Sequence, residues 1–110
     1  MESEIYEENG HLIVAASGKL DTIHAPDFLK VLQAQLETKP KACLLDFTKV
    51  SFLASSGLQV LLSGAKIAKK EEIYFAVFGM QKMVEDVFTV SGFDRFIEHF
   101  RAKEDALSHS

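Results

Sequence analysis

The sequence contains a single cysteine, Cys43, among its 110 residues. One cysteine cannot form an intramolecular disulfide, and its presence alone is typical of a protein in a reducing compartment. The chain has no run of 18 apolar residues, so it lacks the sequence of a membrane-spanning helix. The N-terminal Met-Glu-Ser-Glu has neither the basic region nor the apolar stretch of a secretory signal peptide. We therefore expect a cytoplasmic protein that does not insert into membranes.

Basic charge is also scarce. The chain carries 12 Lys and Arg residues against 16 Asp and Glu residues, a formal net charge of −4. Its densest basic group is followed at once by two glutamates, Glu71 and Glu72. Proteins that bind nucleic acids normally present a basic stripe to the phosphate backbone, so we expect no nucleic-acid partner.

Patterns that hold metals or phosphates are missing as well. The four histidines, His11, His24, His99 and His109, have no metal-ligand spacing and no neighbouring cysteine. Gly64 stands alone within a helical pattern, so the chain has no glycine-rich phosphate loop. We expect neither a metal nor a cofactor.

The composition that remains is that of a folded domain. Hydrophobic residues make up 47% of the chain and charged residues 25%, which excludes a disordered tail. The length suits one core between two packed layers, and no repeat or linker divides the chain. We expect residues 1–110 to form a single domain.

Strand and helix patterns alternate along the chain. Asn9-Gly10 is a strong hairpin turn between strand patterns over 4–8 and 11–18. The later patterns are a helix after Pro26, a strand over 42–47, a helix over 55–68, a strand over 73–78, a helix over 80–90, a short strand or irregular segment near 93–100 and a helical turn over 103–107. This order predicts an α/β fold with a mostly parallel sheet of four to five strands, an antiparallel N-terminal hairpin and helices packed on the sheet.

Apolar residues on the last of these helices predict how it packs. We expect four residues to face inward: Met83, Val84, Val87 and Phe88. Ser91-Gly92 should end the helix, with the glycine in the left-handed conformation. The segment that follows should pack through Phe93, Phe96, Ile97 and Phe100.

The most informative segment is DFTKVSFLASSGLQVLL, from Asp46 to Leu62. It predicts a strand end, a short polar loop, and two serines with a glycine at the start of a helix. Unpaired backbone N–H groups and the positive end of the helix dipole lie there, so a phosphate on Ser55 or Ser56 would be tolerated. Alternatively Ser55 is an ordinary N-cap worth about 1 kcal/mol. A capping box is incomplete, because Leu58 occupies the place of its glutamate.

Four short segments share an order and spacing with a known family. They are Gly18-Lys19-Leu20-Asp21, then Leu45-Asp46-Phe47 with Val50-Ser51-Phe52, then Ser55-Ser56-Gly57-Leu58, and Val90-Ser91-Gly92-Phe93. Together they resemble the STAS family of anti-sigma factor antagonists over roughly residues 10–100, nearly the whole chain. The resemblance implies the STAS fold, with Ser55 at the position that is phosphorylated in the family and Ser56 as the alternative acceptor.

The resemblance also implies a function by partner switching. The unphosphorylated protein would bind an anti-sigma factor, usually also a serine-protein kinase, and phosphorylation of Ser55 would break that complex. A metal-dependent Ser/Thr phosphatase would reset it. The protein itself would be no enzyme. For a small domain that exchanges partners, we expect a monomer when free. A serine hydrolase is disfavoured because Leu53 stands where a nucleophile elbow needs its first glycine.

The expected partner interface surrounds the two serines. It comprises Asp21, Ser55, Ser56, Gly57, Gln59, Val60 and Ser63. Asp21 is equally consistent with a turn residue, and Asp46 either bonds loop amides or touches a partner. Val60 and Ile67, seven residues apart, either offer apolar contact or are buried against a neighbouring helix.

Two residues depart from the family pattern. Ala54 stands where the family usually has Asp, which removes a carboxylate beside the incoming phosphate. Gln59 stands where Gly is common and adds bulk to the expected partner face. Both departures also fit an alternative function, a constitutive STAS scaffold such as a subunit of a lipid-transport ATPase, in which the serine is not modified.

Overall fold

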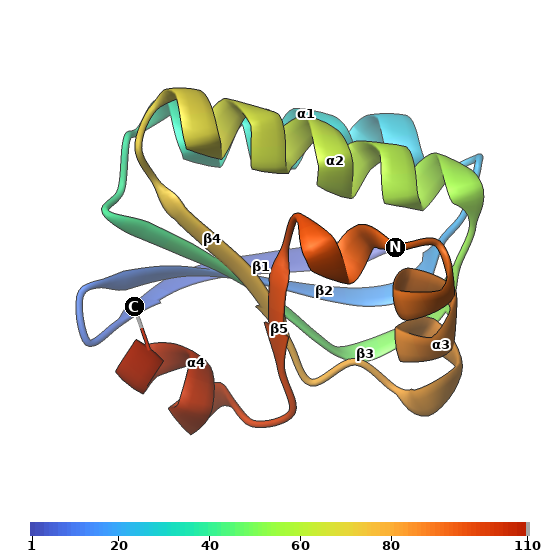
Figure 1. The fold of residues 1–110 in the computed structure, drawn as a ribbon. Helices are drawn as coiled ribbons and strands as arrows, with labels where there is room; N and C mark the ends of the chain where they lie inside the picture. Colours follow the sequence, from blue (N-terminus) through green and yellow to red (C-terminus); the bar gives the residue numbers. More distant parts are fainter. Residues whose placement is uncertain (110) are drawn as a thin grey trace.

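A computed structural model describes residues 1–109 and shows a sheet with helices on both faces (Figure 1). The elements in chain order are β1 (Glu2–Glu8), β2 (His11–Leu20), α1 (Ala25–Glu37), β3 (Ala42–Leu53), α2 (Ser55–Lys70), β4 (Tyr74–Phe78), α3 (Lys82–Val90), a 3-10 turn η1 (Phe93–Arg95), β5 (Glu98–Phe100) and α4 (Lys103–His109). The five strands lie in the order β1-β2-β3-β4-β5. β1 is antiparallel to β2 and the other neighbours are parallel, which confirms the predicted α/β fold with its N-terminal hairpin.

The sheet separates two apolar clusters. Successive strand residues point to opposite faces, so Val14 belongs to the cluster under α1, α2 and α3 while Ile13 belongs to the cluster under α4. Leu45 and Leu44 divide in the same way on β3. Figure 1 shows α1 and α2 lying side by side across one face and the short α4 on the other. The central strands are therefore covered on both faces, as their continuous apolar sequence predicts.

β3 is longer than the sequence predicts. The polar loop expected after Phe47 is wrong, because the strand continues to Leu53 and remains paired with β2. Val50 lies opposite Gly18 and Leu53 opposite Leu20, after register shifts at which β3 carries an extra residue relative to β2. Val50 and Leu53 are both buried, so their burial extends the strand through a stretch whose other residues are mostly exposed.

The expected inward face of α3 is half wrong. Val84 and Phe88 are buried in the cluster under α1, α2 and α3, which is the principal core. Met83, however, is 73% exposed, and Val87 also lies at the surface. α3 packs on β3 and η1, and this contact buries only the two positions one turn apart. Gly92 ends the helix with φ +86°, the left-handed conformation expected of it.

The segment after α3 also differs from the prediction at one aromatic residue. Ile97 is buried and Phe93 packs against the principal core, whereas Phe96 is 70% exposed. The expectation that Phe96 packs inward is therefore wrong. The segment folds back in the tight turn η1, so its aromatic residues do not all face the same way.

Candidate functional site

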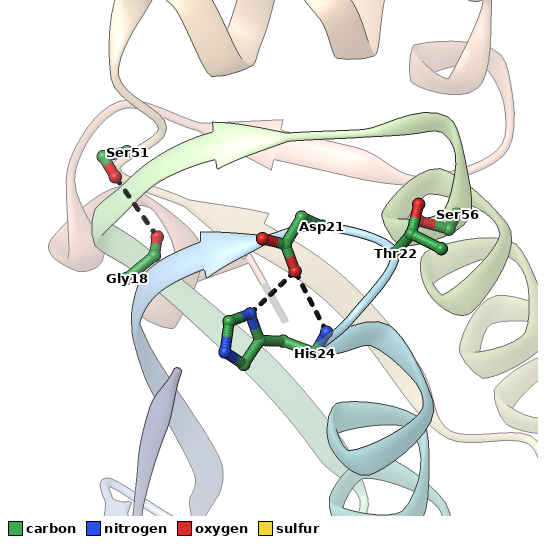
Figure 2. Close-up of polar contacts among 6 residues, drawn as sticks. All are labelled: Gly18, Asp21, Thr22, His24, Ser51 and Ser56. Carbon is green, nitrogen blue, oxygen red and sulfur yellow. Dashed lines mark hydrogen bonds and ion pairs between the residues drawn. The ribbon is translucent and has the colours of Figure 1, made fainter.

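The candidate site lies where β2 and β3 end at the same edge of the sheet. β2 leads into the turn Asp21–His24 before α1, and β3 leads through Ala54 into α2. The Ala54 N–H donates a hydrogen bond to the Leu20 carbonyl at 3.0 Å, which ties the two strand ends together. Because the strand ends are held together, Thr22 of the turn faces Ser56 at the start of α2 (Figure 2). Ligands and partners of parallel sheets usually bind at this edge.

Ser55 is the first residue of α2 and not its N-cap. The N-cap is Ala54, which has extended backbone angles, and its carbonyl accepts a hydrogen bond from the Leu58 N–H at 3.1 Å. The alternative in which Ser55 caps the helix is therefore wrong, because α2 begins at Ser55, one residue earlier than that role requires. Ser55 is exposed, and its hydroxyl has no hydrogen-bond partner among residues 1–109. It stands free at the positive end of a 16-residue helix.

Ser56 has different surroundings. It is half-buried, and its Oγ lies 3.2 Å from the Thr22 Oγ1, a hydrogen bond in which either hydroxyl can donate. The two adjacent serines therefore differ in both exposure and bonding. Thr22 is a residue that the sequence analysis did not single out, because no motif includes it and its partner is 34 positions away.

Asp21 holds the turn together, which is one of its two expected roles. Its Oδ1 accepts the backbone N–H of His24 at 3.0 Å and lies 2.7 Å from the His24 Nδ1. The Asp21 carbonyl accepts the Ala25 N–H at 2.9 Å. The hydrogen bond from the His24 backbone, helped by the imidazole, lowers the pKa of the Asp21 carboxyl from its ordinary value. The carboxylate thus fixes the loop that carries Thr22.

Gly57 brings α2 close to the strand ends. A Cβ atom at this position would lie 2.7 Å from the Leu20 Cγ and 2.8 Å from both the Leu20 carbonyl and the Leu53 Cδ1. These distances are shorter than packed atoms allow, so only glycine fits the contact. Gly57 is buried and therefore positions the serines from beneath the surface.

The remaining expected interface residues divide between surface and core. Gln59 is exposed and Ser63 half-buried. Val60 is only 5% exposed and belongs to the principal core, as the second of its two expected alternatives predicts. Ile67 packs partly buried against the same core.

The turn that carries Thr22 also exposes an apolar side chain. Ile23, next to Thr22 in the turn, is 80% exposed. A lone isoleucine in a polar loop gives no periodic signal, so the sequence did not indicate it.

Asp46 and Cys43 have structural roles. Asp46 lies within β3, away from its end, and its Oδ1 accepts the Thr48 N–H at 3.0 Å and the Thr48 hydroxyl at 2.7 Å. Local bonding is thus the role that the structure shows for Asp46. Cys43 is buried on β3, and that burial raises the pKa of its thiol to about 12, so it is not a reactive nucleophile.

Residues 1–109 contain no group of three or more His, Cys, Asp or Glu side chains placed to hold a metal ion. None of the helices among them has the length and apolar character needed to cross a membrane.

Comparison with known proteins identifies the family. The model of the STAS domain matches residues 2–106, and the chain therefore belongs to the STAS-domain family. It is 23% identical over 91 residues to the anti-sigma-B factor antagonist of Listeria monocytogenes, covering 83% of this chain and 80% of the relative. It is 25% identical over 105 residues to the anti-sigma-F factor antagonist RsfB of Mycobacterium tuberculosis, covering 94% and 84%.

A solved structure supports the same assignment. The crystal structure of an anti-sigma factor antagonist from Mycobacterium paratuberculosis superposes with a TM-score of 0.91 at 25% identity, covering 98% of this chain and 92% of that one. The agreement extends over nearly the entire chain, so the predicted STAS fold is confirmed.

Proposed function

We propose that this protein is an anti-sigma factor antagonist whose affinity for its partner is switched by phosphorylation of Ser55. The observation that carries the proposal is the free, exposed Ser55 hydroxyl at the start of α2. The names of the relatives in Listeria and Mycobacterium give the proposal its partner class. The protein would be a regulatory binding module and a substrate of other enzymes, with no catalytic activity of its own.

The electrostatics of the site favour such a switch. A phosphoryl group adds about −1.5 to −2 charges at neutral pH. The start of α2 stabilises this charge through its unpaired N–H groups and its dipole, and Ala54 places no carboxylate beside it. The same charge would meet a partner surface that had bound a neutral hydroxyl. A coupling of about 1–3 kcal/mol, or 5- to 150-fold in affinity, is typical of regulated binding.

The proposed partners follow from this role. The unphosphorylated protein would bind an anti-sigma factor that is also a serine-protein kinase, and a metal-dependent Ser/Thr phosphatase would remove the phosphate. The contact would centre on the exposed residues Ser55 and Gln59, with Asp21, Ser56 and Ser63 around them and Gly57 and Val60 supporting them from below. We expect the free protein to be a monomer in which residues 1–110 act as a single domain.

Binding measurements with charge variants test the proposal. With the purified anti-sigma factor kinase of the source cell, Ser55→Ala should bind like the parent protein, and Ser55→Asp should bind at least 5-fold more weakly. Ser3→Asp, which adds the same charge on the exposed edge strand β1, is the matched control and should bind like the parent. Equal binding by all variants would contradict the switch and favour a constitutive scaffold.

A further inference from the structure

We propose that Thr22 selects Ser55 over Ser56 as the phosphoryl acceptor by engaging the Ser56 hydroxyl. The inference rests on the proposed function, since it names what decides between two adjacent serines at the same site. Ser55 and Ser56 are chemically identical and follow each other in sequence, so a kinase that reaches one comes close to the other. The selection has to come from what surrounds each hydroxyl.

The surroundings of the two serine hydroxyls differ because the turn before α1 reaches only the hydroxyl of Ser56. Thr22 Oγ1 lies 3.2 Å from Ser56 Oγ, and the two side chains face each other in Figure 2. The Ser55 hydroxyl has no hydrogen-bond partner within residues 1–109. Ser56 is half-buried and Ser55 exposed. Thr22 thus bonds the hydroxyl of Ser56 and leaves that of Ser55 free.

The position of Thr22 is fixed by its neighbours on both sides. The Asp21 carboxylate accepts the His24 N–H, and the Asp21 carbonyl accepts the Ala25 N–H. The bond from the Ala54 N–H to the Leu20 carbonyl holds this turn against the start of α2. A threonine held in this way presents its hydroxyl to Ser56 without further loss of backbone freedom.

Phosphoryl transfer requires a serine hydroxyl that can turn toward the phosphate. The hydrogen bond to Thr22 restrains the hydroxyl of Ser56. The serine oxygen must turn a lone pair toward the γ-phosphorus of a nucleoside triphosphate. The Oγ–P bond then forms as the bond from phosphorus to the bridging oxygen breaks, the hydroxyl proton passes to a base of the kinase, and the nucleoside diphosphate leaves. Ser56 would have to give up its bond to Thr22 to adopt this geometry, and Ser55 has no such bond to break.

Two variants of Thr22 separate the hydroxyl from the bulk of the side chain. Thr22→Val keeps the shape and removes the hydroxyl, while Thr22→Ser keeps the hydroxyl. Each purified protein would be incubated with the source-cell anti-sigma factor kinase and ATP, and fragmentation mass spectrometry would assign phosphate to Ser55 or Ser56. We expect Thr22→Val to raise the Ser56 share roughly 2- to 10-fold, the range set by one net hydrogen bond. Thr22→Ser should retain the parent ratio.

The outcomes distinguish this inference from the function on which it rests. One outcome is phosphate on Ser55 with a Ser56 share that is the same in the parent, Thr22→Val and Thr22→Ser. This outcome would overturn the selection by Thr22 and leave the switch intact. No phosphate on either serine of the parent, with an active kinase, would overturn both. Thr22→Ala, also lacking the hydroxyl, should reproduce the shift seen in Thr22→Val, and thermal unfolding checks that each exposed-site variant is folded. If Thr22→Ala left the ratio unchanged, the selection would be contradicted.

Discussion

At the start of α2, two adjacent serines differ through residues distant in sequence. The local pattern predicted that a hydroxyl pair opens the helix, and the structure agrees on that point. The local sequence pattern could not predict that Ala54 is the N-cap or that Thr22 bonds Ser56, because both features depend on how β2 and β3 end side by side. Tertiary contacts therefore decide the chemistry of residues that local sequence only locates.

A first prediction at this scale concerns Gly57. Gly57→Ala should lower the free energy of unfolding by about 1–3 kcal/mol, because the added methyl group overpacks the contact with Leu20 and Leu53. Urea unfolding measures the change. Gln59→Ala, on the exposed side of the same helix, is the control and should change it by no more than about 0.5 kcal/mol. A Gly57→Ala protein as stable as the parent would show that α2 has room to move away from the strand ends.

A second prediction concerns the pH dependence that Asp21 gives to the fold. The pKa of Asp21 is lowered in the folded state, chiefly by the His24 N–H. A lowered pKa stabilises the fold above the unfolded value of about 3.9, and this contribution is lost as the pH falls through the folded value. Asp21→Asn should therefore be less stable than the parent at pH 7, with a difference that closes below about pH 4.

Urea unfolding at several pH values measures this difference. Glu4→Gln on the edge strand β1, which also removes one exposed carboxylate, controls for the change in net charge. A difference between Asp21→Asn and the parent that stays constant from pH 7 to pH 3 would contradict a role for the carboxylate charge in the turn.

At the scale of the elements, alternation and turn signals predicted the order of strands and helices correctly. The errors occurred where burial departs from simple periodicity. β3 continues past Phe47 because Val50 and Leu53 are buried through a shifted register with β2. α3 exposes Met83 because only its edge nearest β3 and η1 is covered. A single sequence shows which residues are apolar but not how wide a face the neighbouring elements cover.

A third prediction concerns how much the buried and exposed residues of α3 contribute to stability. Phe88→Ala should lower the free energy of unfolding by about 3–5 kcal/mol, because it leaves a cavity in the principal core. Met83→Ala on the same helix should change it by about 0.5 kcal/mol or less, since that side chain is exposed. Chemical denaturation of the two variants in parallel compares them. Similar large losses for both would show that Met83 packs inward after all.

At the scale of the whole molecule, parallel strand order places the candidate site at one edge of the sheet. The alternating pattern predicted a parallel sheet, and parallel strands bring the ends of β2 and β3, with their following loops, together. Asp21 and Ser55, 34 residues apart, thereby belong to one surface. The proposed switch adds charge to this surface and needs no rearrangement of the sheet or of the helices that cover it.

The most direct test of this account is the site and effect of phosphorylation in the parent protein. The chain would be incubated with ATP and the source-cell anti-sigma factor kinase, its phosphopeptides mapped, and the affinity of the phosphorylated form for that kinase compared with that of the untreated form. We predict phosphate on Ser55 and an affinity lowered 5- to 150-fold. An unmodified Ser55 in the presence of active kinase, or a phosphorylated protein that binds as tightly as before, would contradict it.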